Sequence, residues 1–145
     1  IIEAIHDERL GELFQRARDA MATEDTAAAR LVLGNRLFIR WLTEHPDFLR
    51  IHLDNSVWAS NPQGVSEGQM HAWRRGIELI ASVIATAMSE GDMHDGDPIV
   101  AARLLVAMQQ VFMSVWVENG MHEDAETLAS RVEEQLRRSL FRSMT

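Results

Sequence analysis

The sequence predicts an all-α fold, a six-helix bundle-like domain, and three observations carry this prediction. Apolar residues recur at the three-to-four-residue spacing of a helix along the chain. Long alternating runs and hairpin turns between β-branched segments are missing from the sequence. The 145 residues, of which 46% are apolar, suffice for one domain with a core of its own.

The first half of the chain predicts three helices. The first is expected over residues 1–22 and the second over about 26–43, each with an apolar stripe. Pro46 separates the second helix from the third, because the residue before a proline is disfavoured in helical geometry. Pro46 and Asp47 then suit the first turn of a helix that extends to about Trp58.

The second half predicts three more helices, with a loop over 59–65 before them. Ser66 and Gln69 form a capping-box pattern that opens a fourth helix, expected to continue to about residue 90. Asp97 and Pro98 suit the N-cap and first position of a fifth helix over 98–119, which Gly120 ends. A sixth helix is expected over about 123–142, with acidic residues at its start and arginines at its end.

The fifth helix is apolar on nearly all sides. Ile99, Leu105 and Phe112 follow one face, whereas Val111 and Val115 lie on another. A helix of this kind must be buried on more than one side. In a chain this short, one side can face the chain's own core and the other a partner chain.

Composition argues against several classes of function. The net charge of −8 and the pI of about 5.2 argue against nucleic-acid or anionic-membrane binding by these residues. The chain has no cysteine, so it has no disulfide framework or thiolate zinc site. No apolar run is expected to approach the length of a membrane span, and the first residues do not form a signal peptide.

The sequence gives no positive signal for catalysis, a metal or a cofactor. Glu3 and His6 have the spacing of half a di-iron motif, but the second half is missing from the sequence. The segment over 92–97 lacks the alternating ligands and closing glutamate of a calcium loop. No serine lies in a nucleophile elbow. We therefore predict that the protein is not an enzyme and binds neither metal nor cofactor.

The helices of the second half resemble those of a known family. Asp97-Pro98 opens a helix, Ala101-Ala102 and Leu104-Leu105 follow, and Trp116 precedes Gly120 and an acidic helix start. The turn over 44–48, EHPDF, fits the same pattern. These features resemble the C-terminal half of TetR (tetracycline-repressor-like) bacterial transcription regulators.

The resemblance implies a division of labour within a longer protein. Residues 1–145 would be a single ligand-binding and dimerisation domain, with a helix-turn-helix DNA-binding domain preceding Ile1. Such a regulator, typically a repressor, works in the cytoplasm as a homodimer, and a small hydrophobic effector alters its affinity for operator DNA. The last two helices would form a four-helix bundle with a symmetry mate. The predicted dimer seam comprises Leu104, Val111, Val115, Leu128, Val132, Leu136 and Leu140.

Aromatic and methionine side chains on several helices predict the wall of an apolar ligand cavity, although plain core packing would give the same pattern. The predicted ligand-binding residues are Phe38, Trp41, His52, Asn55, Trp58, Met70, Trp73, Met108 and Phe112. Polar residues within these helices, which need a hydrogen-bond partner if buried, are Asn35, His52, Asn55, His71 and Gln109.

Two other functions stay open. A ligand-free all-α dimerisation and interaction module would show the same helices with a fully packed interior. A helical-bundle enzyme is a third possibility, and retention of stoichiometric iron or zinc would reveal it.

Overall fold

The computed structural model of the chain describes residues 2–54 and 67–142, and it confirms the all-α prediction. The six helices are α1 (Ile2–Met21), α2 (Ala27–Glu44), α3 (Pro46–Asp54), α4 (Glu67–Ser89), α5 (Pro98–Glu118) and α6 (Ala125–Ser139). Their number and order are those predicted, and the bounds of α1, α2 and α5 agree closely with the predicted ones. Asn55, Trp58, Ser66 and the expected loop over 59–65 lie outside the described residues.

Side chains fix the start of three helices. Thr26, Asp97 and Asp124 are the N-caps of α2, α5 and α6, and each accepts a hydrogen bond from a backbone N–H of the first turn. Gly91 and Gly120 follow α4 and α5 with φ of +86° and +84°, a conformation that glycine adopts without strain. The expected stop signals after α4 and α5 therefore act as predicted.

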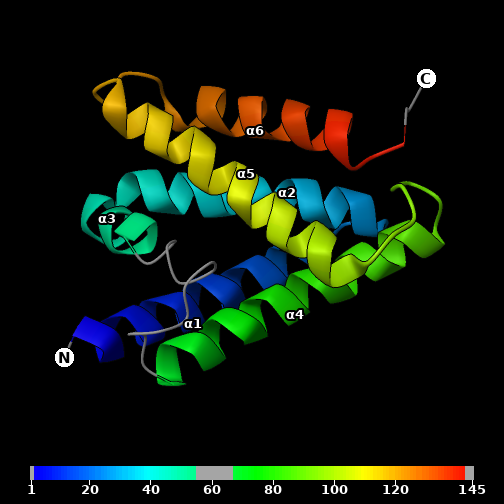
Figure 1. Cartoon of the computed structure of the whole chain (residues 1–145), viewed down its shortest axis with the longest axis horizontal. Helices are drawn as coiled ribbons and strands as arrows, with labels where there is room; N and C mark the ends of the chain where they lie inside the picture. The colour runs from blue at the N-terminus through cyan, green and yellow to red at the C-terminus, as the bar shows by residue number, and fades with distance from the viewer. Residues whose placement is uncertain (1, 55–66, 143–145) are drawn as a thin grey trace.

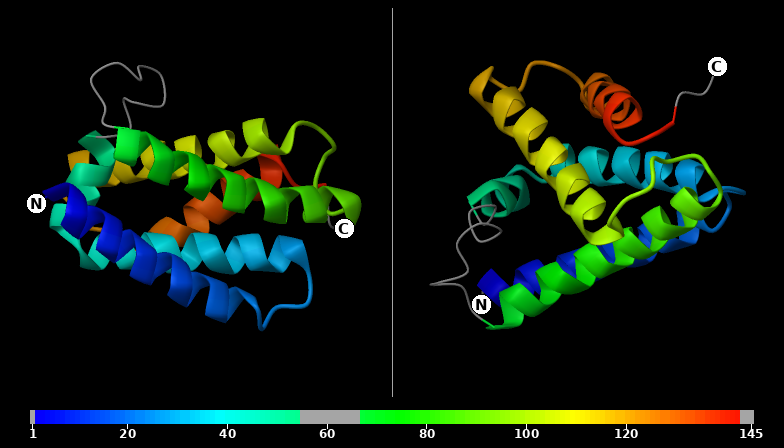
Figure 2. Two further views of the ribbon diagram at one scale, coloured as in Figure 1. Left: turned by 90° about the horizontal axis from the view of Figure 1, so that it is seen from below. Right: turned by 45° about the vertical axis from the view of Figure 1, so that its right-hand side comes forward.

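Helix α2 is the centre of the molecule, because it packs against α1, α3, α4 and α6. Helix α5 crosses in front of it, while α6 runs along the opposite edge of the fold from α1 and α4 (Figure 1). Seen from below, α4 and α5 lie in one layer and α1 and α2 in another (Figure 2). Helix α5 packs mainly on α4 and α6, and it approaches α2 closely at few described positions.

The described core consists of two clusters. The first joins α2, α4 and α5 around residues such as Leu31, Ile84 and Leu105. The second joins α2, α3, α5 and α6 around Ile39 and Met113. Both clusters are built on α2 and α5, in successive turns, so each of these helices passes from one cluster to the other.

Helix α6 ends at Ser139, earlier than the predicted residue 142. The residues that follow pair with the loop between α4 and α5, where Met93 and Phe141 form an isolated antiparallel bridge. The N–H of His94 donates to the carbonyl of Leu140, and the N–H of Arg142 donates to that of Asp92, each over 2.9 Å. These bonds attach the end of the described chain to the α4–α5 loop.

Helix α5 corrects one expectation from the sequence. By length and composition it is the one described helix that could cross a membrane, with a mean hydropathy of 1.5 over an 18-residue window that is 33% buried. The prediction that no apolar run approaches this length was therefore wrong. The core helix of a soluble protein meets the same criteria, and Ala102, Leu105 and Met113 of α5 do lie in the core.

Candidate ligand-binding site and partner surface

Aromatic side chains meet where α2 turns into α3. Helix α2 ends at Glu44, α3 begins at Pro46, and the two helices pack against each other. The rings of Trp41 and Phe48 meet edge to face with centroids 4.6 Å apart, and those of Phe38 and His52 do so at 5.5 Å. The structure thus brings together Phe38, Trp41 and His52 of the predicted ligand wall, all only partly buried.

His45 completes this aromatic corner, although it is not among the predicted ligand-binding residues. Its ring stacks on Trp41 with centroids 4.3 Å apart, and its Nδ1 lies 2.7 Å from the carbonyl oxygen of Trp41. The signal available in the sequence was its four-residue spacing from Trp41, which places the two side chains on one helix face.

The remaining predicted wall residues lie on α4 and α5. Trp73 and Met108 are half-buried at the edge of the first cluster, and the guanidinium of Arg103 lies 5.2 Å from the Trp73 ring centroid. Phe112 is half-buried at the edge of the second cluster, together with Phe38 and Trp41. The predicted wall is therefore divided between two clusters. Met70 lies on α4, and its side chain is outside the described part of the structure.

A pair of amides lies between the two clusters. Asn35 of α2 and Gln109 of α5 are 3% and 4% exposed, and they are the buried polar residues of the described chain. The Nε2 of Gln109 donates to the Oδ1 of Asn35 over 3.0 Å. The Nδ2 of Asn35 is buried and has no hydrogen-bond partner among the described residues. Both residues are among the polar candidates from the sequence, although the sequence alone does not predict that they meet.

Other candidates lie elsewhere. His71 is exposed on α4. The side chains of Glu3 and His6 are not described, and no group of three metal-ligating side chains gathers within the described residues.

An unpartnered apolar face covers one side of α5. Val100, Leu104, Val111 and Val115 are 52%, 49%, 61% and 47% exposed, and their spacing places them on one stripe of the helix. Exposed apolar stripes of this length are typical of interaction surfaces. Leu104, Val111 and Val115 belong to the predicted dimer seam.

The α6 residues of the predicted seam lie differently. Leu128, Val132 and Leu136 are each 1% exposed, because they pack into the core beneath α6. Leu140, just after the helix, is half-buried against the first cluster. These side chains stabilise the chain itself and leave almost no apolar surface of α6 for a partner.

A shallow groove of about 300 Å³ runs between α5 and α6. Its lining residues are Phe112, Arg131, Glu134, Gln135 and Arg138. Arg138 is paired with Glu134 over 2.6 Å, and Arg131 is paired with Glu123 over the same distance. The groove is open and its charges are already paired, so it suits contact with a polar surface better than enclosure of an apolar ligand.

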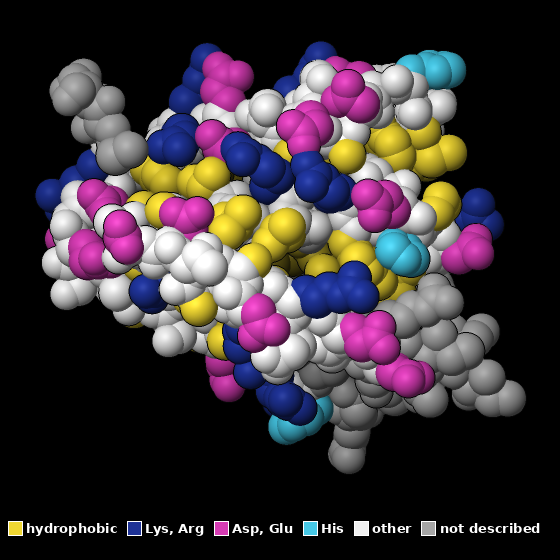
Figure 3. All heavy atoms as spheres, turned by 180° about the vertical axis from the view of Figure 1, so that it is seen from behind, with side chains coloured by type: hydrophobic (Ala, Val, Ile, Leu, Met, Phe, Trp, Pro, Cys, Tyr) yellow, Lys and Arg dark blue, Asp and Glu magenta, His cyan; other side chains and the backbone are white. Residues whose placement is uncertain are grey.

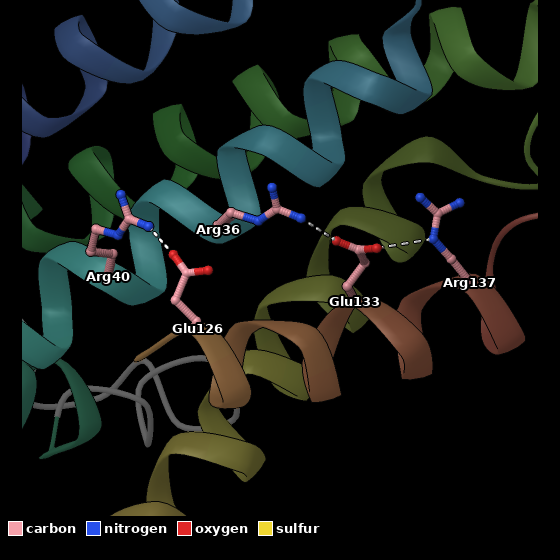
Figure 4. Close-up of polar contacts among 5 residues, drawn as sticks. All are labelled: Arg36, Arg40, Glu126, Glu133 and Arg137. Atoms are coloured by element: carbon pink, nitrogen blue, oxygen red, sulfur yellow. Dashed lines mark hydrogen bonds and ion pairs between the residues drawn. The ribbon is translucent and has the colours of Figure 1, made fainter. Parts of the chain in front are cut away.

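Ion pairs join the outer faces of α2 and α6. Glu133 of α6 lies 3.1 Å from Arg36 of α2 and 3.2 Å from Arg137 of its own helix, and Arg40 pairs with Glu126 (Figure 4). On the back of the molecule, a row of acidic and basic side chains lies above a band of exposed apolar atoms (Figure 3). Exposed pairs of this kind contribute little energy each, but together they favour one placement of α6 on α2.

One carboxyl group has a shifted pKa. The backbone N–H and side-chain hydroxyl of Thr127 donate to Asp124, and these hydrogen bonds lower the pKa of Asp124 below its usual 3.8. This agrees with its position as the N-cap of α6, where a negative charge is favourable.

The chain is similar to solved structures, among them a transcriptional regulator. It has a TM-score of 0.72 with the transcriptional regulator FadR from Bacillus subtilis in complex with stearoyl-CoA, with 16% identity over 92% of this chain and 72% of FadR. It has a TM-score of 0.71 with a protein of unknown function from Rhodococcus sp. RHA1, with 17% identity over 97% of this chain and 71% of that one. No family model and no curated protein sequence matches the chain. At these identities the likeness establishes the shared fold.

Proposed function

We propose that this chain is the effector-binding and dimerisation domain of a TetR-like transcriptional regulator. The observation that supports this most directly is the likeness to FadR, which was solved with stearoyl-CoA and shares its fold with 92% of this chain. The resemblance of the Asp97-Pro98 helix and of the turn over 44–48 to TetR regulators points the same way.

The effector would be a molecule with a long apolar part. We place it in the interior between α2, α3, α4 and α5, where half-buried aromatic and thioether side chains line the edges of both clusters. The described wall residues are Phe38, Trp41, His52, Trp73, Met108 and Phe112; Met70, Asn55 and Trp58 remain predicted members of it.

The dimer would form through the exposed face of α5. Val100, Leu104, Val111 and Val115 give a continuous apolar strip, and the neighbouring α6 offers arginine and glutamate side chains beside it. A core of apolar residues with a charged rim is the usual composition of a stable interface. Across a two-fold axis, an arginine on α6 of one protomer could pair with a glutamate on α6 of its partner.

Ligand binding would change the affinity of the parent protein for operator DNA. A helix-turn-helix domain preceding Ile1 in the parent protein would contact the operator, and the spacing of two such domains in the dimer would set operator affinity. An effector that prefers one arrangement of the protomers shifts this spacing, whereas one that binds both equally changes nothing. We propose a cytoplasmic repressor that loses operator affinity when the effector binds.

Thermal denaturation of the purified chain with stearoyl-CoA tests the sensor function. At a free concentration about 100 times its dissociation constant, a ligand of the folded state adds about 2.7 kcal/mol of stability, so the melting temperature should rise by several degrees. Coenzyme A without the acyl chain is the control and should give a smaller rise.

The same experiment can reject the proposal. If acyl-CoAs of all chain lengths and free fatty acids leave the melting temperature unchanged, while the chain still dimerises, the ligand-free interaction module becomes the better description.

A further inference from the structure

The buried amide pair of Asn35 and Gln109 has more hydrogen-bonding capacity than the described chain uses. A side-chain amide carries two N–H donors and one carbonyl acceptor. Gln109 uses one donor on the Oδ1 of Asn35, at 3.0 Å. The Nδ2 of Asn35 has no partner among the described residues, although Asn35 is only 3% exposed. A buried donor left without an acceptor is costly, so its retention needs an explanation.

The position of the amide pair in the fold suggests a role for the unpaired Nδ2 donor of Asn35. Asn35 lies one helical turn from Leu31 of the first cluster and one from Ile39 of the second. Gln109 has the same relation to Leu105 and Met113 on α5. The pair therefore lies at the junction of the two clusters, each of which contains side chains of both α2 and α5.

The half-buried aromatic residues are adjacent to this junction. Phe38 follows Asn35 by three residues on α2, and Phe112 follows Gln109 by three on α5, so each lies next to an amide on its own helix face. Both phenyl rings border the second cluster. An apolar molecule in contact with them would bring its polar end within reach of the amides.

We propose that Asn35 Nδ2 is a ligand-binding donor, and that it binds the uncharged carbonyl oxygen of an ester, thioester or ketone whose apolar part lies among the aromatic side chains. This inference rests on the proposed effector-binding function and specifies the ligand's polar group. A carbonyl oxygen satisfies the buried donor without bringing a charge into the core. A carboxylate would need a buried cation, and no arginine of the described residues is buried.

The pair of substitutions Asn35→Leu with Gln109→Leu tests the proposal. Replacing both amides by apolar groups of similar size removes the unpaired donor, so the ligand-free protein should melt at the same temperature or higher. Its affinity for stearoyl-CoA should fall about 5- to 10-fold, the usual effect of one lost neutral hydrogen bond. Gln110→Leu, at the next, half-buried position of α5, is the matched control and should leave the affinity unchanged.

A spectroscopic measurement on the unaltered protein covers the case in which the double variant does not fold. Stearoyl-CoA labelled with ¹³C at the thioester carbonyl should show, when bound, an infrared carbonyl band at lower frequency than in an apolar solvent. A band at the apolar-solvent position would overturn the proposal. So would a folded double variant with undiminished affinity for stearoyl-CoA.

The class of polar group is tested by competition. Methyl laurate should displace bound stearoyl-CoA at a lower concentration than laurate does, because of these two competitors only laurate would bring a carboxylate charge to the amides. The reverse order would overturn the proposal that the bound polar group is an uncharged carbonyl. These results differ from those expected if the proposed effector-binding function is wrong. If that function is wrong, no acyl compound binds the unaltered protein, and this inference is then wrong as well.

Discussion

Helices α5 and α6 are neighbours in sequence and space, yet they distribute their apolar residues in opposite ways. Helix α6 concentrates Leu128, Val132 and Leu136 on one stripe and buries all three within its own chain. Helix α5 buries a stripe that includes Leu105 and Met113, and still exposes a second one. Of these two helices, α5 is therefore the one with a surplus of exposed apolar side chains.

An apolar stripe in a helix sequence can pack into the chain's own core or against a partner chain, and the structure distinguishes these two roles for α6 and α5. The apolar stripe of α6 is fully buried within the chain itself. The outer face of α6 is polar, and its Glu133 forms an ion pair with Arg36 of α2 (Figure 4). Exposed valines and a leucine on α5 are costly in water and gain stability only when something covers them. The proposed dimer seam is therefore centred on α5, and the polar face of α6 would lie at its rim.

The largest effect is expected from Leu128→Ala on α6. Leu128 is 1% exposed, and truncation of a buried leucine costs about 2–5 kcal/mol through lost burial and the cavity left behind. Denaturant unfolding at several protein concentrations should show this loss at all of them. The matched control is Leu104→Ala on α5, which is 49% exposed and should lower stability only at concentrations where the dimer forms. Equal, concentration-independent losses for both variants would remove the contrast between the helices.

A comparable but more specific effect is expected from Val111→Glu. Val111 is 61% exposed, so a carboxylate there should leave the monomer folded. In a dimer the substitution places an unpaired charge on each side of the seam, which should weaken association by about 100-fold or more. Analytical ultracentrifugation measures this change.

Leu79→Glu provides the control for that experiment. Leu79 is a 37% exposed apolar residue on α4, away from the proposed seam, so its replacement should leave the dimer intact. An unaltered chain that is monomeric at high concentration would contradict the dimer seam altogether.

The fold could be predicted from the sequence because its signals are local. Pro46, Asp97 and Gly120 determine where helices begin and end through their own backbone and side-chain preferences, independently of distant residues. Where a distant contact intervened, the prediction failed: the bridge between Met93 and Phe141 ends α6 before residue 142.

The site could be predicted only in part. Helical spacing identified the aromatic residues, but it could not divide them between two clusters or bring Asn35 to Gln109, since those relations depend on how α2, α4 and α5 pack. For the same reason, the apolar stripe of α6 could not be assigned to the chain's own core from its periodicity. A stripe predicts burial, and only the fold shows against what.

The smallest effect is expected at the N-cap of α6, and it tests whether α6 depends on charge at all. Hydrogen bonds from Thr127 lower the pKa of Asp124 below 3.8, so the carboxylate stabilises the folded state at pH above about 3.8 and this stability is lost as pH falls through the lower, folded-state pKa. Asp124→Asn keeps the capping oxygen and removes the charge. Unfolding measured between pH 7 and pH 3 should show a slightly steeper acid loss for the unaltered chain than for the variant, with the two converging at the acid end. Identical pH profiles would mean that burial of the α6 stripe, rather than the charge at its first turn, is what holds this helix in place.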